Sequence, residues 1–116
     1  MNYPEIELAV RKKTPTENEG QLTVDIFQTG QEIVIRSTVA GADSNDIDVS
    51  ITKDMVTIKG RREPNESVDP SEYYHQEIYW GPFSRSIILP VDIDPEKSKA
   101  SMKNGILTVR LPKLTK

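Results

Sequence analysis

The sequence predicts an all-β protein, an antiparallel β-sandwich of about eight short strands in one domain. Three observations lead to this prediction. Apolar and polar residues alternate over several short runs, turn-forming residues separate those runs, and no stretch has the apolar spacing of a long helix. With 116 residues, of which 35% are hydrophobic, the chain has the length of one domain of ordinary globular composition.

The first strand pattern begins near Gln21. Residues 1–20 have little periodicity and include a charged, turn-prone segment, so they are expected to form a loose arm before a domain that spans residues 21–112. A turn at residues 29–31 separates the first strand from a second, Glu32–Val39. The apolar positions of these two strands, which the alternation assigns to a buried face, are Leu22, Val24, Ile26, Ile33 and Ile35.

Two further strands follow a cluster of turn residues at positions 40–45. Ile47, Val49 and Ile51 alternate with polar residues, which predicts one buried and one solvated face. A short link at residues 53–54 leads to the next strand, which starts at Met55 and ends before Pro64, because proline cannot donate to a sheet ladder.

Aromatic residues gather in the stretch Ser71–Pro90. It follows a polar segment, residues 65–71, and Gly81-Pro82 divides it into a part with strand-like composition, Glu72–Tyr79, and a stronger strand, Phe83–Leu89. Such a cluster indicates a core, a ligand platform or a protein contact, and composition leaves all three open. The aromatic residues are Tyr73, Tyr74, Tyr79, Trp80 and Phe83.

The last part of the chain predicts one helical turn and a hairpin. Asp94-Pro95 suits a cap followed by a first helical position, so residues 92–97 are expected to be a loop with a single turn of helix. Strands Lys99–Lys103 and Ile106–Leu111 flank Asn104-Gly105, a strong signal for a type I′ turn. The last strand is expected to stop at Pro112.

Composition excludes several classes of function. A net charge of −3 gives no overall attraction to nucleic acid or to an anionic membrane, and the chain has no cysteine for a disulfide or a thiolate metal site. The N-terminus lacks the apolar segment of a secretory signal, and no later run reaches the length of a membrane span. We therefore expect a cytoplasmic protein that binds neither nucleic acid nor membrane.

Catalytic and metal chemistry has little basis in the residues present. His75 stands alone, and the acidic run at residues 43–48 lacks the glycine and one oxygen ligand of a calcium loop. Asp92 and Asp94, with Trp80 for stacking, suggest a carbohydrate-active site, but a cap and turn explain these carboxylates better. The phosphate-loop and nucleophile-elbow motifs are absent. We predict a non-enzyme without cofactor, metal or nucleotide.

Four blocks of sequence resemble the small heat-shock protein family, whose shared unit is the α-crystallin domain, in its bacterial, archaeal and plant type. Ala100–Leu107 with Val109–Pro112 resembles the family's signature hairpin, and Val56–Arg62 resembles its leucine-x-isoleucine-x-glycine strand. Gly81–Ser86 with Leu89-Pro90 resembles its glycine-x-phenylalanine-x-arginine block, and Gly41 lies in its usual turn. The order and spacing match from about Leu22 to Pro112.

The resemblance implies an immunoglobulin-like sandwich of seven to nine strands and an ATP-independent chaperone that captures partly unfolded client proteins before they aggregate. It also implies a homodimer in which Ser71–Tyr79 of one chain pairs with the Leu22–Gln28 region of the other. A long link between strong strands supports this exchange independently, since compact domains rarely keep one without a function. The implied dimer residues are Tyr73, Tyr74, Glu77, Ile78, Tyr79, Trp80, Arg85, Leu22, Val24 and Ile26, with Glu77 as a candidate ion-pair partner of Arg85.

The resemblance further implies a groove between two edge strands, which receives an apolar-x-apolar segment from a partner's tail. Its residues would be Ile47, Val49, Ile51, Ala100 and Met102. Alternation alone does not distinguish a groove from plain core, so both interpretations of these side chains stay open. The turn residues that the family shares are Gly41, Asn104 and Gly105.

Three departures from the family pattern affect these expectations. The tail at residues 113–116 carries no apolar-x-apolar motif and the arm is short, so large cages are not expected. Ala40 replaces the proline usual before Gly41, and Ile78 stands where many relatives carry an arginine. The alternative is a monomeric adaptor like the co-chaperone CS domains, which share the sandwich but lack the exchanged strand.

Overall fold

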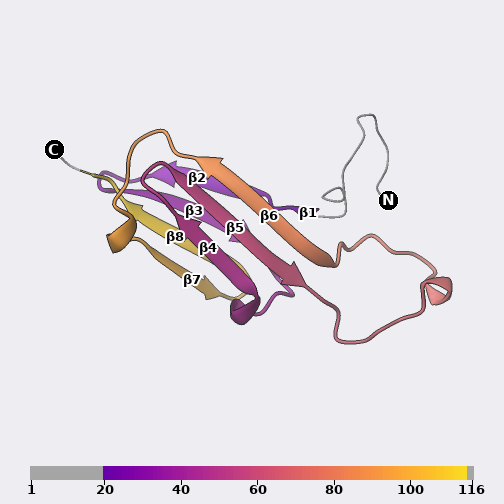
Figure 1. The fold of residues 1–116 in the computed structure, drawn as a ribbon. Helices are drawn as coiled ribbons and strands as arrows, with labels where there is room; N and C mark the ends of the chain where they lie inside the picture. The colour runs from indigo at the N-terminus through magenta and orange to yellow at the C-terminus, as the bar shows by residue number, and fades with distance from the viewer. Residues whose placement is uncertain (1–19, 115–116) are drawn as a thin grey trace, which may run out of the picture.

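The computed structural model describes residues 20–114, which fold as two β-sheets packed face to face (Figure 1). Each sheet has four strands, and the described strands are joined by turns, short 3₁₀ turns and one long loop. The strands are β1 (Gly20–Gln21), β2 (Val24–Gln28), β3 (Glu32–Thr38), β4 (Ile47–Ile51), β5 (Met55–Arg62), β6 (Gly81–Ile88), β7 (Lys99–Lys103) and β8 (Ile106–Pro112). The predicted β-sandwich is confirmed.

One sheet has the order β1-β6-β5-β4, and the other has the order β2-β3-β8-β7. All neighbouring strands pair antiparallel except β1 and β6, which pair parallel over two residues. The expected single strand from Gln21 is therefore wrong, because the chain passes from one sheet to the other at Leu22-Thr23. The Ser37 hydroxyl donates to the Thr23 carbonyl at 2.8 Å, which holds this crossing against β3.

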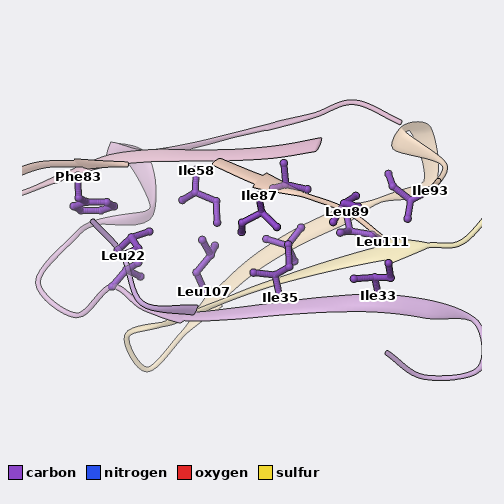
Figure 2. Close-up of a cluster of buried hydrophobic side chains, with 13 residues drawn as sticks. Leu22, Ile33, Ile35, Ile58, Phe83, Ile87, Leu89, Ile93, Leu107 and Leu111 are labelled. Carbon is purple, nitrogen blue, oxygen red and sulfur yellow. The ribbon is translucent and has the colours of Figure 1, made fainter. Parts of the chain in front are cut away.

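The core lies between the sheets and consists almost entirely of the alternating apolar positions (Figure 2). Ile33 and Ile35 point inward, as the alternation predicts. Val34 is fully buried on the outer face, where its cross-strand neighbours are Phe27 and Arg110. Burying aliphatic side chains of this size stabilises the fold by roughly 1.5–3 kcal/mol each. The core side chains are Leu22, Ile33, Ile35, Val39, Val56, Ile58, Phe83, Ile87, Leu89, Ile93, Leu107, Val109 and Leu111.

Two predicted turns have the backbone conformation that their residues favour. Asn104 and Gly105 have φ values of 53° and 78°, as a type I′ hairpin turn requires. Gly41 has a φ of 91°, and the Ala42 amide donates to the Val39 carbonyl at 3.0 Å, so residues 39–42 form a type II turn with glycine at its third position. Ala40 takes the second position, where proline is common.

Aspartate caps a 3₁₀ turn at three places. Asp94 accepts a hydrogen bond from the Glu96 amide and caps Pro95–Lys97, which confirms the predicted single turn. Asp43 caps Ser44–Asp46 in the same way, and Asp69 caps Pro70–Glu72. Among residues 20–114, the structure contains no helix of the length and apolar character needed to cross a membrane.

The long loop, residues 63–80, leaves the sandwich between β5 and β6 and extends away from both sheets (Figure 1). Its second half, Glu72–Tyr79, has strand-like composition but forms no strand within its own chain. A strand needs a neighbour to satisfy its backbone groups, and the loop extends beyond every strand of its own sheets. Because Glu72–Tyr79 does not pair with any strand of its own chain, its predicted pairing with a second chain stays a proposal.

A close contact between Gly60 and Phe83 joins β5 to β6. The two residues are register partners, and a Cβ atom at Gly60 would lie 2.5 Å from Cζ of the Phe83 ring and 3.0 Å from the Asp46 carbonyl oxygen. Real Cβ atoms do not approach other atoms this closely, so the ring occupies the space that a side chain at position 60 would need. This contact brings together the two sequence blocks that contain Gly60 and Phe83.

We predict that Gly60→Ala destabilises the protein by about 1–3 kcal/mol, because the added methyl group overpacks a filled core against backbone that cannot move away. Chemical denaturation followed by circular dichroism measures this difference in the free energy of unfolding.

Gly30→Ala is the matched control, because a Cβ atom at Gly30 would meet nothing within 4 Å. This control is expected to leave the free energy of unfolding within about 0.5 kcal/mol of the wild-type value. Equal effects of the two substitutions would show that the Phe83 ring does not impose glycine at position 60.

Candidate functional site: two open edges and a projecting loop

Each sheet ends in strands that lack a neighbour on one side. β4 and β7 are the last strands of their sheets and face each other across one side of the sandwich, while β2 and the short β1 end the sheets at the other side. Unpaired strand edges present rows of backbone donors and acceptors, so they are the places where a further extended segment can add. These two edges and the projecting loop make up the candidate site.

An apolar groove lies between β4 and β7. It is a hollow of about 150 Å³, and its lining includes four of the five residues that the sequence suggests for a groove. Ile51, the fifth, is absent from the lining and packs against the core. Three of the lining side chains pack against the core and also remain partly open to the groove: Ile47, Val49 and Met102. The full lining is Ser44, Ile47, Val49, Ala100, Ser101, Met102 and Leu107.

The opposite edge, formed by β2, carries apolar side chains on both faces. Ile26 pairs with the buried Ile35 and so faces inward, yet it is 44% exposed, because the facing β1 is too short to cover it. The expectation that Ile26 is buried is therefore wrong. Phe27 lies on the outer face, also exposed, with the Arg36 guanidinium 5.1 Å from its ring centroid. This edge is apolar and uncovered.

The other two residues assigned to this edge, Leu22 and Val24, have a different environment. Leu22 is buried within the core of its own chain, and Val24 is half-buried against that core. Their side chains stabilise the single sandwich, whereas Ile26 and Phe27 are the residues that β2 presents to solvent. The alternation pattern did not identify Phe27 as part of the candidate site, because it assigns that position to the solvated face. The signal that could have identified it is an aromatic residue at a solvent-facing position.

The projecting loop carries six of the residues that the resemblance assigns to a partner contact and exposes three of them; Tyr73, Tyr79 and Trp80 are half-buried. Tyr74 is fully exposed and Ile78 is 61% exposed. A carboxylate oxygen of Glu77 lies within hydrogen-bond distance of His75 Nε2 on the same loop, at 2.6 Å. Large apolar side chains on a segment that extends into solvent are typical of an interaction surface.

The tip of this loop is ordered by Asp69. The Ser71 backbone amide donates to the Asp69 carboxylate at 2.9 Å, and the Ser71 hydroxyl donates at the same distance. Both hydrogen bonds favour the charged form and hold the pKa of Asp69 below its ordinary value. The loop therefore contains a defined turn at its tip.

Arg85 joins the two sheets at the β2 side. It lies on the inward face of β6, and its Nη1 donates to the Leu22 carbonyl at 2.6 Å, at the point where the chain crosses between the sheets. Within the single chain, Glu77 pairs with His75 and not with Arg85. An ion pair between Arg85 and Glu77 across two chains stays a prediction.

The residues considered for other chemistry have structural roles. Asp43 and Asp94 cap 3₁₀ turns. Asp92 forms an exposed ion pair with Lys53, whose Nζ lies 4.0 Å from Oδ2 of the aspartate. In the part of the chain that the structure describes, no group of three or more potential ligands could hold a metal ion. Arg62 is a residue that sequence reasoning missed: its charge suggests a solvated position, but its spacing from Ile58 and Gly60 puts it on the core-facing side of β5, against the Phe83 ring.

The chain matches the model of the Hsp20/alpha crystallin family over residues 25–116, which is most of its length, and it belongs to this family. Spore protein SP21 of Stigmatella aurantiaca is 34% identical over 89 residues, which cover 77% of this chain and 53% of that protein. Small heat shock protein C4 of Rickettsia felis is 35% identical over 89 residues, which cover 77% of this chain and 55% of that protein. The chain thus spans about half the length of these relatives.

Solved structures agree with this assignment. The hspA protein from Xanthomonas axonopodis superposes with a TM-score of 0.74 and 28% identity, over 82% of this chain and 95% of that one. Heat shock protein 16.0 from Schizosaccharomyces pombe superposes with a TM-score of 0.73 and 27% identity, over 84% of this chain and 70% of that one. The predicted family is confirmed, and neither the family match nor these relatives favour the co-chaperone adaptor.

We predict that Arg85→Ala lowers the free energy of unfolding by about 1.5–3 kcal/mol, because the substitution removes a partly buried, charge-assisted hydrogen bond to the Leu22 carbonyl. The measurement is denaturation at a fixed protein concentration.

Arg61→Ala is the matched control, since Arg61 is exposed and its ion-pair partner among the described residues is the exposed Glu63. Loss of this surface ion pair is expected to lower the free energy of unfolding by less than about 1 kcal/mol. An Arg85→Ala variant as stable as Arg61→Ala would contradict the role of Arg85 in joining the sheets.

Proposed function

We propose that this protein is an ATP-independent holdase chaperone that acts as a strand-exchanged homodimer. The observation that carries the proposal is the projecting loop, which has no ladder pairing within its own chain and holds Tyr74 and Ile78 in solvent. Long loops in compact domains usually have a function. The family consists of small heat-shock chaperones rather than enzymes.

The β2 edge is the proposed acceptor for the loop of a second chain. In an extended segment, Tyr74 and Ile78 share one face, because side chains alternate with a period of two. Pairing that segment with β2 would satisfy the unpaired backbone edge and bring apolar side chains onto Ile26 or Phe27. Both partners in this contact are exposed apolar groups, so their mutual burial supplies the driving force.

The groove between β4 and β7 is the proposed site for extended apolar segments, either from unfolding clients or from an apolar-x-apolar segment of another chain. The lining combines backbone edges with Ile47, Val49 and Met102, which suits a segment that adds as a strand and inserts alternate apolar side chains. The proposal involves no nucleotide, nucleic acid or membrane, and it includes a cytoplasmic location, in keeping with a chain that has no cysteine.

A small heat-shock protein from Xylella fastidiosa is another solved structure that resembles this chain, with a TM-score of 0.72 and 29% identity over 82% of this chain and 87% of that one. Its structure is described as a distinct high order structure. Assembly of that protein supports the proposal that this chain also associates with copies of itself.

We predict that the wild-type chain sediments as a dimer and that Ile26→Lys weakens the dimer at least about tenfold, which corresponds to about 1.4 kcal/mol. A lysine at this position opposes the addition of a strand to the β2 edge. Sedimentation velocity over a dilution series measures the dissociation constant.

Ile88→Lys is the matched control. Ile88 is 80% exposed, but it lies on the outer face of β6 rather than on the β2 edge. This variant is expected to dimerise like the wild type, and deletion of residues 71–79 is expected to yield a monomer. A wild-type chain that is monomeric throughout the dilution series would contradict the strand-exchanged dimer and favour the adaptor alternative.

We predict that the protein suppresses light scattering by a heated client, such as citrate synthase, at up to one chain per client and without ATP. Exposed apolar surface on the chaperone covers the apolar segments that otherwise join unfolding molecules together. Unchanged scattering at equimolar chaperone would contradict the holdase proposal.

The groove variant Met102→Glu tests where clients bind in the same assay. A charge in the apolar lining opposes insertion of apolar side chains, so this variant is expected to suppress scattering less than the wild type while keeping its dimer. Suppression equal to that of the wild type would place client binding outside the groove.

A further inference from the structure

Both ends of the projecting loop are fastened to the same turn of the sandwich. Arg62, the last residue of β5, and Trp80, the residue before β6, both lie against Gly41. A Cβ atom at Gly41 would lie 3.1 Å from Cγ of Arg62 and 3.4 Å from Cζ3 of Trp80. Because Gly41 has no side chain, the residues at both ends of the loop pack directly against the backbone of the type II turn.

Among residues 20–114, packing contacts rather than hydrogen bonds position the Arg62 side chain. Its guanidinium carbon lies 5.6 Å from the centroid of the Phe83 ring, and its Nε atom is buried without a hydrogen-bond partner among the described residues. Phe83 in turn lies on Gly60, so its ring cannot shift toward β5. The position of Arg62 is thus set by a core residue on one side and by Gly41 on the other.

Tyr79 adds a second restraint where the loop returns to β6. Its hydroxyl donates to the Pro82 carbonyl at 2.6 Å, which closes a tight bend over Gly81. Gly81 has a φ of 127°, and a Cβ atom there would lie 3.1 Å from the Tyr79 oxygen. The bend therefore requires glycine, and it fixes the direction in which the returning chain enters β6.

We propose that Arg62, Trp80 and Gly41 form a loop clamp, which sets the direction of residues 63–80 so that their exposed face is ready to meet a second chain. The proposal rests on the strand-exchanged dimer. A loop whose ends are already fixed loses less conformational freedom when it pairs, and preorganisation of this kind strengthens association without adding a contact. Trp80 and Tyr79 are then positioning residues within their own chain, whereas Tyr74 and Ile78 meet the partner.

The fluorescence of Trp80 tests this assignment on the unmodified chain of residues 1–116, because Trp80 is the only tryptophan in this sequence. Emission spectra and sedimentation are recorded on the same dilution series. If Trp80 packs within its own chain, its emission maximum stays constant while the dimer dissociates. A red shift that follows dissociation would overturn the clamp and assign Trp80 to the partner contact. Absence of any dimer would instead overturn the proposed function, so the two failures are distinguishable.

Variants then separate positioning from contact. Gly41→Ala and Arg62→Ala are expected to increase acrylamide quenching of Trp80 in the monomer and to weaken the dimer about tenfold or more. Ile78→Ala is expected to weaken the dimer while leaving the quenching of Trp80 unchanged. If Gly41→Ala fails to fold, because alanine is strained at a φ of 91°, Arg62→Ala provides the same comparison. Clamp variants that loosen Trp80 but dimerise like the wild type would overturn the proposal.

Discussion

The packing of Phe83 on Gly60 is the contact on which the rest of the structure depends. The ring fills the space of a missing side chain, joins β5 to β6 across their register, and lies against the Arg62 guanidinium. Because β5 and β6 are the central strands of their sheet, this contact also determines how the sheet meets the core. A larger residue at position 60 would displace the ring from the core and the arginine from the base of the loop.

Stability and association use different parts of the sandwich. The buried residues lie on the facing sides of the strands, while the exposed apolar residues Ile26, Phe27, Tyr74 and Ile78 lie on an edge strand and on the loop. A single chain can therefore complete its core while leaving strand edges and apolar side chains unsatisfied. Edge-to-edge addition is a hazard for most β proteins. Here the short β1 leaves the β2 edge uncovered, which is what the proposed strand exchange needs.

Sequence alone predicted the fold well where the signal was local. Alternation placed Ile33 and Ile35 correctly, and Asn104-Gly105 identified the hairpin turn, because each of these features depends on a few adjacent residues. The crossing at Leu22-Thr23 could not be predicted in this way. Leu22, Val24 and Ile26 share one alternation pattern, but they differ in burial because β1 and β2 belong to different sheets.

The candidate site was only partly predictable for the same reason. The family resemblance suggested the residues of the groove, but only the facing of β4 and β7 across the sandwich shows which of their side chains line a hollow as well as support the core. Arg62 and Phe27 were missed because charge and solvent-face position suggested ordinary surface residues. Their roles come from neighbours distant in sequence, Phe83 and Gly41 for Arg62 and Arg36 for Phe27.

The type II turn at Gly41 connects the hairpin that defines the family to the loop that is proposed to exchange. The Val39 amide donates to the Gly105 carbonyl at 2.8 Å, and the Ala40 methyl group lies close to Gly105, so the turn rests on the hairpin. On its other side the same turn supports Arg62 and Trp80. Three glycines with positive φ, at positions 41, 81 and 105, lie along this one path. Each admits an approach that a side chain would block, which explains why sequence blocks far apart in the chain occur together: they meet at the base of the loop.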